Sequence, residues 1–68
     1  MWGEQMKLKD LMEGDYIYIH ERDERMGGTV YIVGEYDGSD NTYWVYECGD
    51  VDKGMFLSAE KVVWQVME

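Results

Sequence analysis

The sequence contains no proline and only one cysteine, Cys48, among its 68 residues. A single cysteine cannot form an intramolecular disulfide or an all-cysteine metal site, which argues against a disulfide-stapled secreted scaffold. No apolar run approaches the roughly 20 residues of a membrane-spanning helix, and the first residues lack the positive charge and apolar stretch of a signal peptide. We therefore expect a cytoplasmic protein without a membrane partner.

Basic residues are also scarce. Six lysines and arginines stand against fifteen aspartates and glutamates, which gives a formal charge of -9 at pH 7. Most of these carboxylates must lie at the surface, because an unpaired buried carboxylate is costly. Direct binding to nucleic acid is disfavoured, whereas a basic protein surface, such as that of a nucleic-acid-handling protein, would be attracted. The alternative explanation is that the charge only keeps a small domain soluble.

What the chain does have is apolar surface. Hydrophobic residues make up 46% and aromatic residues 15% of the sequence, enough to fold despite the charge imbalance. A chain near this length buries only about 60% of the surface that its unfolded form exposes, which leaves no room for a second core. We predict one domain over residues 1–68, in which residues 1–6 could be a flexible arm.

Short β-strands dominate the pattern. Apolar and polar residues alternate with the period of two that is typical of strands, and the runs are separated by glycine-rich and acidic turns. The predicted strands are Asp15–His20, Thr29–Tyr36, Thr42–Cys48, Met55–Ser58 and Val62–Val66. Between them we predict a charged mobile loop over Glu21–Gly28 and turns over 37–41, 49–54 and 59–61. One short helical turn is expected within Lys7–Met12, ended by Gly14.

Five short strands cannot bury both faces of a flat sheet in so small a chain, so we expect an all-β fold: a small barrel or a crossed meander. From about Lys7 to Val66 the chain resembles the SH3-like small barrels. The resemblance rests on Leu8, Leu11 and Gly14-Asp15 before the first strand, the long charged loop, three hairpin-connected strands and the tight turn at 58–61. It implies a five-stranded barrel and identifies no specific family.

No catalytic residue, cofactor or metal site is predicted, and we do not expect an enzyme. Cys48 and His20 could form a nucleophile–base pair, but nothing in their spacing brings them together, and a lone cysteine at a strand end is more often a small buried apolar residue. Asp50–Gly54 is similar to the opening of a calcium loop. The similarity then fails, because Met55 and Lys61 occupy the positions that need glycine and glutamate.

Aromatic residues exceed what one small core can absorb. If Ile17, Ile19, Val30 and Ile32 point inward, alternation sends Tyr16, Tyr18 and Tyr31 outward together. We predict a partner-binding aromatic face formed by Tyr16, Tyr18, Tyr31 and Trp44. Its predicted acidic rim consists of Glu21, Asp23, Glu24, Asp37, Asp40, Asp50 and Asp52. The alternative is that these tyrosines only form stabilising cross-strand pairs.

The leading hypothesis is a small acidic binding module that occupies a basic surface of a partner protein. Its most concrete version is an inhibitor or decoy whose carboxylates imitate nucleic-acid phosphates, and in size and charge the chain resembles small acidic bacteriophage proteins that block host defence enzymes in this way. One alternative is an SH3-like peptide-binding or assembly module. Another is a small-ligand binder that stacks a flat group between aromatic rings, for which a homo-oligomer could supply a combined cleft.

Overall fold

Six strands and two short helical segments make up the part of the chain that is described by the computed structural model, which is residues 4–66. The side chains of Glu4 and Glu24 lie outside this description. The elements are β1 (Glu4–Lys7), the 3-10 turn η1 (Leu8–Asp10), β2 (Tyr16–Tyr18), α1 (Glu21–Met26), β3 (Tyr31–Asp37), β4 (Thr42–Glu47), β5 (Asp50–Ser58) and β6 (Val62–Gln65). The all-β class predicted from the sequence is confirmed.

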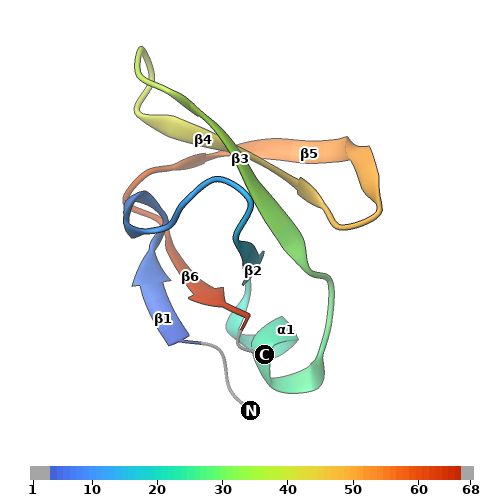
Figure 1. Ribbon diagram of the computed structural model, residues 1–68. Coiled ribbons are helices and arrows are strands. Elements are labelled where there is room, and N and C mark those ends of the chain that lie inside the picture. Colours follow the sequence, from blue (N-terminus) through green and yellow to red (C-terminus); the bar gives the residue numbers. More distant parts are fainter. Residues whose placement is uncertain (1–3, 67–68) are drawn as a thin grey trace.

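All six strands belong to one antiparallel sheet with the order β1-β6-β2-β3-β4-β5. The sheet curls into a half-barrel, with β3, β4 and β5 crossing one end and β1, β6 and β2 forming the other wall (Figure 1). Its inner face holds the core, and its outer face is turned away from it. The helix α1 lies against β2 and β6.

The core is aliphatic and lies on the inner face. Ile17, Val33, Val45 and Val63 are completely buried and come from four neighbouring strands, and the equally buried Leu8 of η1 belongs to the same cluster. Alternation along each strand is the reason, because residues two apart face the same side of a sheet. The inward orientation predicted for Ile17 and Ile19 is confirmed, since both are buried.

The prediction of five strands was wrong by one, because β1 was not recognised. Its sequence, Glu-Gln-Met-Lys, contains one apolar residue and carries almost no alternation signal. The strand forms because its backbone pairs with β6, where Met6 lies opposite Val63 and packs against the core. The arm predicted over residues 1–6 therefore contributes residues 4–6 to the sheet, while residues 1–3 lie outside the description.

The mobile loop predicted over Glu21–Gly28 was also wrong for most of its length, because Glu21–Met26 form α1. Two local interactions support this helix: an ion pair between Arg25 Nη2 and Glu21 Oε1 at 3.2 Å, one helical turn apart, and Gly27 in the left-handed conformation at its C-terminus. The helical turn predicted near the N-terminus is confirmed as η1. Within residues 4–66, neither helical segment combines the length and apolar character needed to cross a membrane.

The turn predicted over 49–54 was wrong for most of its length, because β5 begins at Asp50 and contains an irregularity there. Glu47 pairs with Asp50, yet the preceding Tyr46 pairs with Gly54, so residues 51–53 bulge out of the ladder. The tight turn itself consists of Cys48 and Gly49, and Gly49 has a φ of 95°. Cys48 is exposed at this turn, so the expectation of a buried cysteine was wrong.

Candidate binding groove

The outer face of the sheet carries a band of large side chains. Strand pairing places Tyr16 opposite Ile32, Ile32 opposite Tyr46 and Tyr46 opposite Gly54, so these four residues form one row across β2, β3, β4 and β5. A second pair, Trp44 and Phe56, lies beside this row on β4 and β5. Their ring centroids are 5.1 Å apart with a tilt of 58°.

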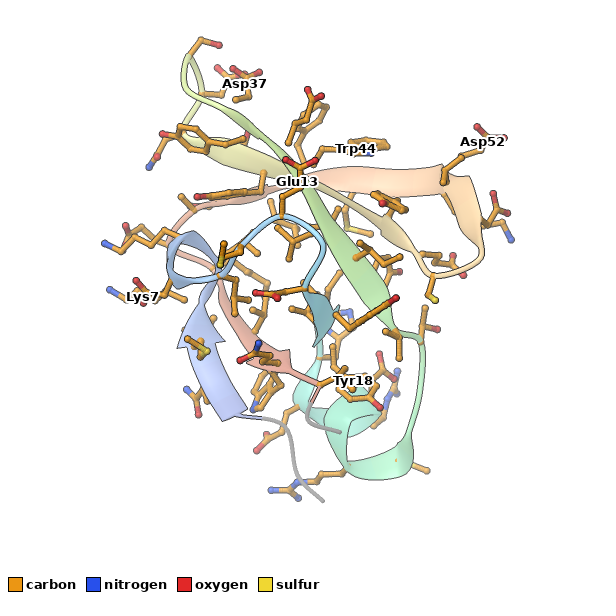
Figure 2. All side chains as sticks on the ribbon, in the orientation of Figure 1. Lys7, Glu13, Tyr18, Asp37, Trp44 and Asp52 are labelled. Atoms are coloured by element: carbon orange, nitrogen blue, oxygen red, sulfur yellow. The ribbon has the colours of Figure 1, made fainter. Side chains whose placement is uncertain are left out.

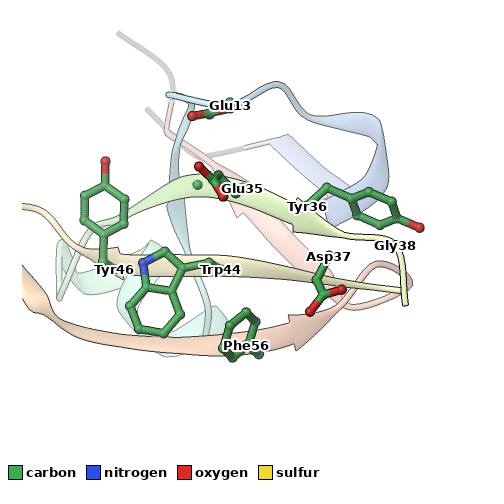
Figure 3. A pocket seen from close by; sticks show the side chains of 9 residues that line it. Glu13, Glu35, Tyr36, Asp37, Gly38, Trp44, Tyr46 and Phe56 are labelled. Atoms are coloured by element: carbon green, nitrogen blue, oxygen red, sulfur yellow. The ribbon is translucent and has the colours of Figure 1, made fainter. Parts of the chain in front are cut away.

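A groove of about 550 Å³ opens over β3, β4 and β5. It is lined by Glu13, Gly34, Glu35, Tyr36, Asp37, Gly38, Trp44, Tyr46 and Phe56. Figure 3 shows the Trp44 and Phe56 rings next to each other, with the Tyr46 ring toward one end and the Asp37 carboxylate toward the other. We call this feature the Trp44 groove. It is an open surface depression, and 59% of Phe56 is exposed.

Two glycines make room for the indole of Trp44. A Cβ atom at Gly54 would overlap the ring and lie 2.6 Å from the carbonyl oxygen of Val45. A Cβ atom at Gly34 would lie 2.8 Å from the carbonyl oxygen of Trp44 and 3.0 Å from its ring. The approaches to the two carbonyl oxygens, at 2.6 and 2.8 Å, are shorter than real Cβ atoms show, so a side chain at either position would force the backbone or the indole to shift.

A β-bulge places Glu35, the first of three carboxylates, at the groove. The ladder between β3 and β4 shifts register between Val33 and Tyr36, so Gly34 and Glu35 together face Trp44. This bulge lies next to the indole and directs the Glu35 side chain into the lining of the groove.

The loop before β2 carries the second carboxylate, that of Glu13. The backbone N–H of Gly14 donates to the carbonyl of Val33 at 2.8 Å, and the N–H of Val33 donates to the carbonyl of Asp15 at 2.9 Å. The Asp15 carboxylate also accepts a hydrogen bond from the backbone N–H of Met12 at 2.8 Å, which closes the loop. Glu13, at the tip of this loop, is thereby held at the edge of the groove (Figure 3).

Asp37 is the third carboxylate. Its Oδ1 accepts hydrogen bonds from the hydroxyl of Ser39 at 2.7 Å and from the backbone N–H of Ser39 at 3.0 Å. These hydrogen bonds hold the pKa of Asp37 below its ordinary value, and the bond from the Ser39 hydroxyl has the larger effect. Asp37 therefore stays ionised to a lower pH than a free aspartate and keeps one fixed negative charge at the groove.

Four of the six basic side chains form ion pairs away from the groove. Lys7 and Lys9 form ion pairs with Glu60 at 3.1 and 3.0 Å, Arg25 pairs with Glu21, and Lys53 lies 4.0 Å from Asp50. The lysine contacts lower the pKa of Glu60 and raise that of Lys9. Within residues 4–66, none of the three groove carboxylates has an ion-pair partner. The Trp44 groove therefore combines exposed aromatic rings with uncompensated negative charge.

Three of the four residues predicted to form the aromatic face share the outer face. Tyr16 is 45% exposed, Tyr18 is half-buried opposite Trp64, and Trp44 lines the groove. The outward orientation predicted for Tyr31 was wrong, because Tyr31 shares the inner face with fully buried Val33 and packs against the core. The prediction assumes that Val30 and Ile32 face the core. Ile32 instead lies on the outer face, half-buried opposite Tyr16.

The seven acidic residues predicted to form a rim lie in three separate places. Asp37 ends β3 and Asp40 lies in the β3–β4 turn, Asp50 and Asp52 begin β5 at the far end of β4, and Glu21 and Asp23 belong to α1. Figure 2 shows Asp37 and Asp52 on opposite sides of the molecule. Only Asp37 lines the groove, and the Glu24 side chain lies outside the description. The residues of the predicted acidic rim are thus divided among three places, and their role in partner binding stays a prediction.

Of the nine groove residues, the sequence reasoning named only Asp37 and Trp44, and the missed ones include Glu13, Glu35, Tyr46 and Phe56. Alternation could have found Tyr46, because it follows Trp44 by two positions. Glu35 and Phe56 depend on the bulge and on the pairing of β5 with β4, and Glu13 depends on a loop that reaches β3 through its backbone. Those contacts join distant parts of the chain and leave no local pattern.

No protein-family model matches this chain, and no curated protein and no solved structure shows significant similarity to it.

Proposed function

We propose that the protein is a non-enzymatic binding module that takes a positively charged side chain of a partner protein into the Trp44 groove. The observation that carries the proposal is the meeting of Trp44 and Phe56 with Glu13, Glu35 and Asp37 in one open depression. A cation over the face of an aromatic ring is attracted by the ring quadrupole, with tryptophan the strongest case. Carboxylates around the ring add charge-assisted hydrogen bonds.

Arginine fits this groove better than lysine. The groove is shallow, so its occupant keeps partial contact with water, and a weakly hydrated guanidinium tolerates a half-open aromatic site better than a strongly hydrated ammonium. A guanidinium is also planar, so it can stack on the Trp44 indole while its N–H groups point sideways to Glu35 and Asp37. The partner we propose is accordingly an arginine-rich basic surface, of the kind that nucleic-acid-handling proteins expose.

The inhibitor or decoy hypothesis is compatible with this site, but it also sets a requirement on the shape of the partner. Because the residues of the predicted acidic rim lie in three separate places, a decoy would have to be enclosed by its partner, whereas the groove supplies one defined contact. The small-ligand hypothesis is less favoured, because the Trp44 and Phe56 rings contact each other and leave no slot between them for a flat group.

Two further parts of the proposal concern fold family and location. An SH3-like barrel is supported by the order of the strands that follow α1 and by the tight turn at Ala59–Glu60 between β5 and β6. A cytoplasmic location is supported by the single unpaired cysteine, which is exposed at the β4–β5 turn.

An NMR titration with a blocked Gly-Arg-Gly peptide tests the proposal. We expect the indole N–H resonance of Trp44 to shift progressively with peptide concentration, and a peptide with neutral citrulline in place of arginine to leave it unmoved. Glu35→Gln should weaken the interaction several-fold, whereas Asp23→Asn, which removes the same charge on α1 beside β2 and β6, should change it only slightly. Equal shifts with arginine and citrulline would contradict the proposal.

A further inference from the structure

We propose that the partner segment binds as an added strand, extended and antiparallel, along the free edge of β5 from Gly54 to Ser58, with its basic side chains on the groove side. This inference rests on the proposed function and specifies the form of the partner. Within residues 4–66, β5 pairs with β4 alone, so its other edge has no strand beside it. The bulge at residues 51–53 ends the regular edge on one side, and the tight turn at Ala59–Glu60 ends it on the other.

The hydrogen-bond phase of β5 shows which backbone groups are free. The N–H of Ala59 donates to the carbonyl of Asn41 at 3.0 Å, so in the alternating antiparallel pattern Leu57 and Met55 also point their backbone groups toward β4. Gly54, Phe56 and Ser58 then point theirs outward. The carbonyl of Ser58 already accepts the N–H of Lys61 at 2.9 Å. Gly54 and Phe56 keep both their N–H and C=O groups for a partner strand.

The two faces of this edge differ in chemistry. Phe56 lies on the outer face beside Trp44, next to the uncompensated carboxylates of the groove. Met55, which is 40% exposed, and Leu57, which packs against the core, lie on the inner face. Directly opposed residues of an antiparallel pair have their side chains on the same face. The partner residues opposite Gly54 and Phe56 therefore face the groove, and the residue between them faces Met55.

The edge thus selects an alternating sequence: basic, apolar, basic. A partner residue opposite Phe56 lies one strand spacing from β5 and two strand spacings, about 10 Å, from β4. A long basic side chain at that position crosses the Phe56 ring to reach Trp44. Backbone pairing supplies affinity and the alternating side chains supply specificity, as in other cases of strand addition.

Charge decides between a foreign segment and a second copy of this chain. Two copies would each bring a formal charge of -9, which opposes self-association, whereas a basic segment is attracted by the same field. Lys53 and Asp52 in the bulge place charges at the edge, a device that discourages pairing between identical edges.

The test uses a synthetic pentapeptide, acetyl-Val-Arg-Val-Arg-Val-amide, and two N-methylated forms of it. In the proposed register the arginine N–H groups bond to β5 and those of the middle and last valines point away. Methylation of both arginine nitrogens should weaken binding about tenfold or more, because two hydrogen bonds are lost, whereas methylation of the two valine nitrogens should leave affinity unchanged. Affinity would be measured by NMR titration of the intact protein.

The outcomes separate the two proposals. If both N-methylated peptides bind equally while Glu35→Gln weakens all three, the groove binds cations but the segment is not an added strand, and this inference is overturned. If none of the peptides binds and Gly-Arg-Gly also fails, the proposed function fails with it. A dimer detected by sedimentation at the concentrations of the titration, with the Gly54 and Phe56 amides protected from exchange in the free protein, would assign the edge to a second copy and likewise overturn the inference.

Discussion

Replacing Gly54 by alanine should disturb both the stability of the sheet and the position of Trp44. The added Cβ would overlap the indole ring and approach the Val45 carbonyl oxygen to 2.6 Å. The ring can rotate away, but the carbonyl belongs to the β4 backbone and cannot move without bending the strand. Overpacking of this kind typically costs about 1–3 kcal/mol of unfolding free energy. In a domain of this size each kcal/mol lowers Tm by roughly 4–8 °C, so we expect a fall of about 4–24 °C.

Gly38→Ala is the matched control for this experiment. The nearest atom to a Cβ at Gly38 is on the Tyr36 ring at 3.5 Å, an ordinary contact, and Gly38 does not have a positive φ. The same chemical change there should alter stability by less than about 1 kcal/mol. Thermal unfolding followed by circular dichroism measures both variants, and the Trp44 indole N–H resonance reports the ring. Equal Tm values for the two variants, with the indole resonance unmoved in Gly54→Ala, would refute the close approach described here.

Three further predictions address the core, the groove and the β4–β5 turn. Leu8→Ala, at a completely buried position, should lower the unfolding free energy by about 2–5 kcal/mol, whereas Met12→Ala, at a position 75% exposed, should change it by less than about 0.5 kcal/mol in urea denaturation. Ser39→Ala should raise the pKa of Asp37 toward its ordinary value in a carboxyl NMR titration. Because the pKa of Asp37 is lowered in the folded protein, the ionised carboxylate stabilises the fold above the unfolded-state pKa, and this stabilisation is lost as the pH falls through the folded-state pKa. The variant should lose this pH-dependent stabilisation. Cys48 should react with a maleimide in the native protein as readily as in urea, and a thiol protected until unfolding would contradict its exposure.

Alternation predicted much of the fold, because it reports directly which strand residues face the core. Ile17 and Ile19 were assigned to the inside correctly, and the strand near residues 42–48 was found within two residues of its observed end. The same reasoning failed for Tyr31, because a run of β-branched residues supports either phase and the partner strand decides between them. In this protein, Val33 pairs with Val45 and carries Tyr31 to the inner face.

Neither α1 nor the groove could be predicted from local sequence patterns, for different reasons. Apart from Met26 the segment of α1 is polar and has no apolar stripe, so only the spacing of Glu21 and Arg25 and the glycine after Met26 could have indicated a helix. The groove combines a loop, a bulge and two paired strands. The surplus of aromatic residues did predict an outward aromatic surface, and Trp44 was placed in it, but its position between two glycines follows from pairing.

The most direct test of the central claim is a set of intermolecular NOEs between the blocked Gly-Arg-Gly peptide and the protein. We predict contacts from the δ-methylene protons of the arginine to the ring protons of Trp44 and Phe56. Contacts to the rings of Tyr16 and Tyr18 instead, or saturable binding with no contact to Trp44, would contradict the account.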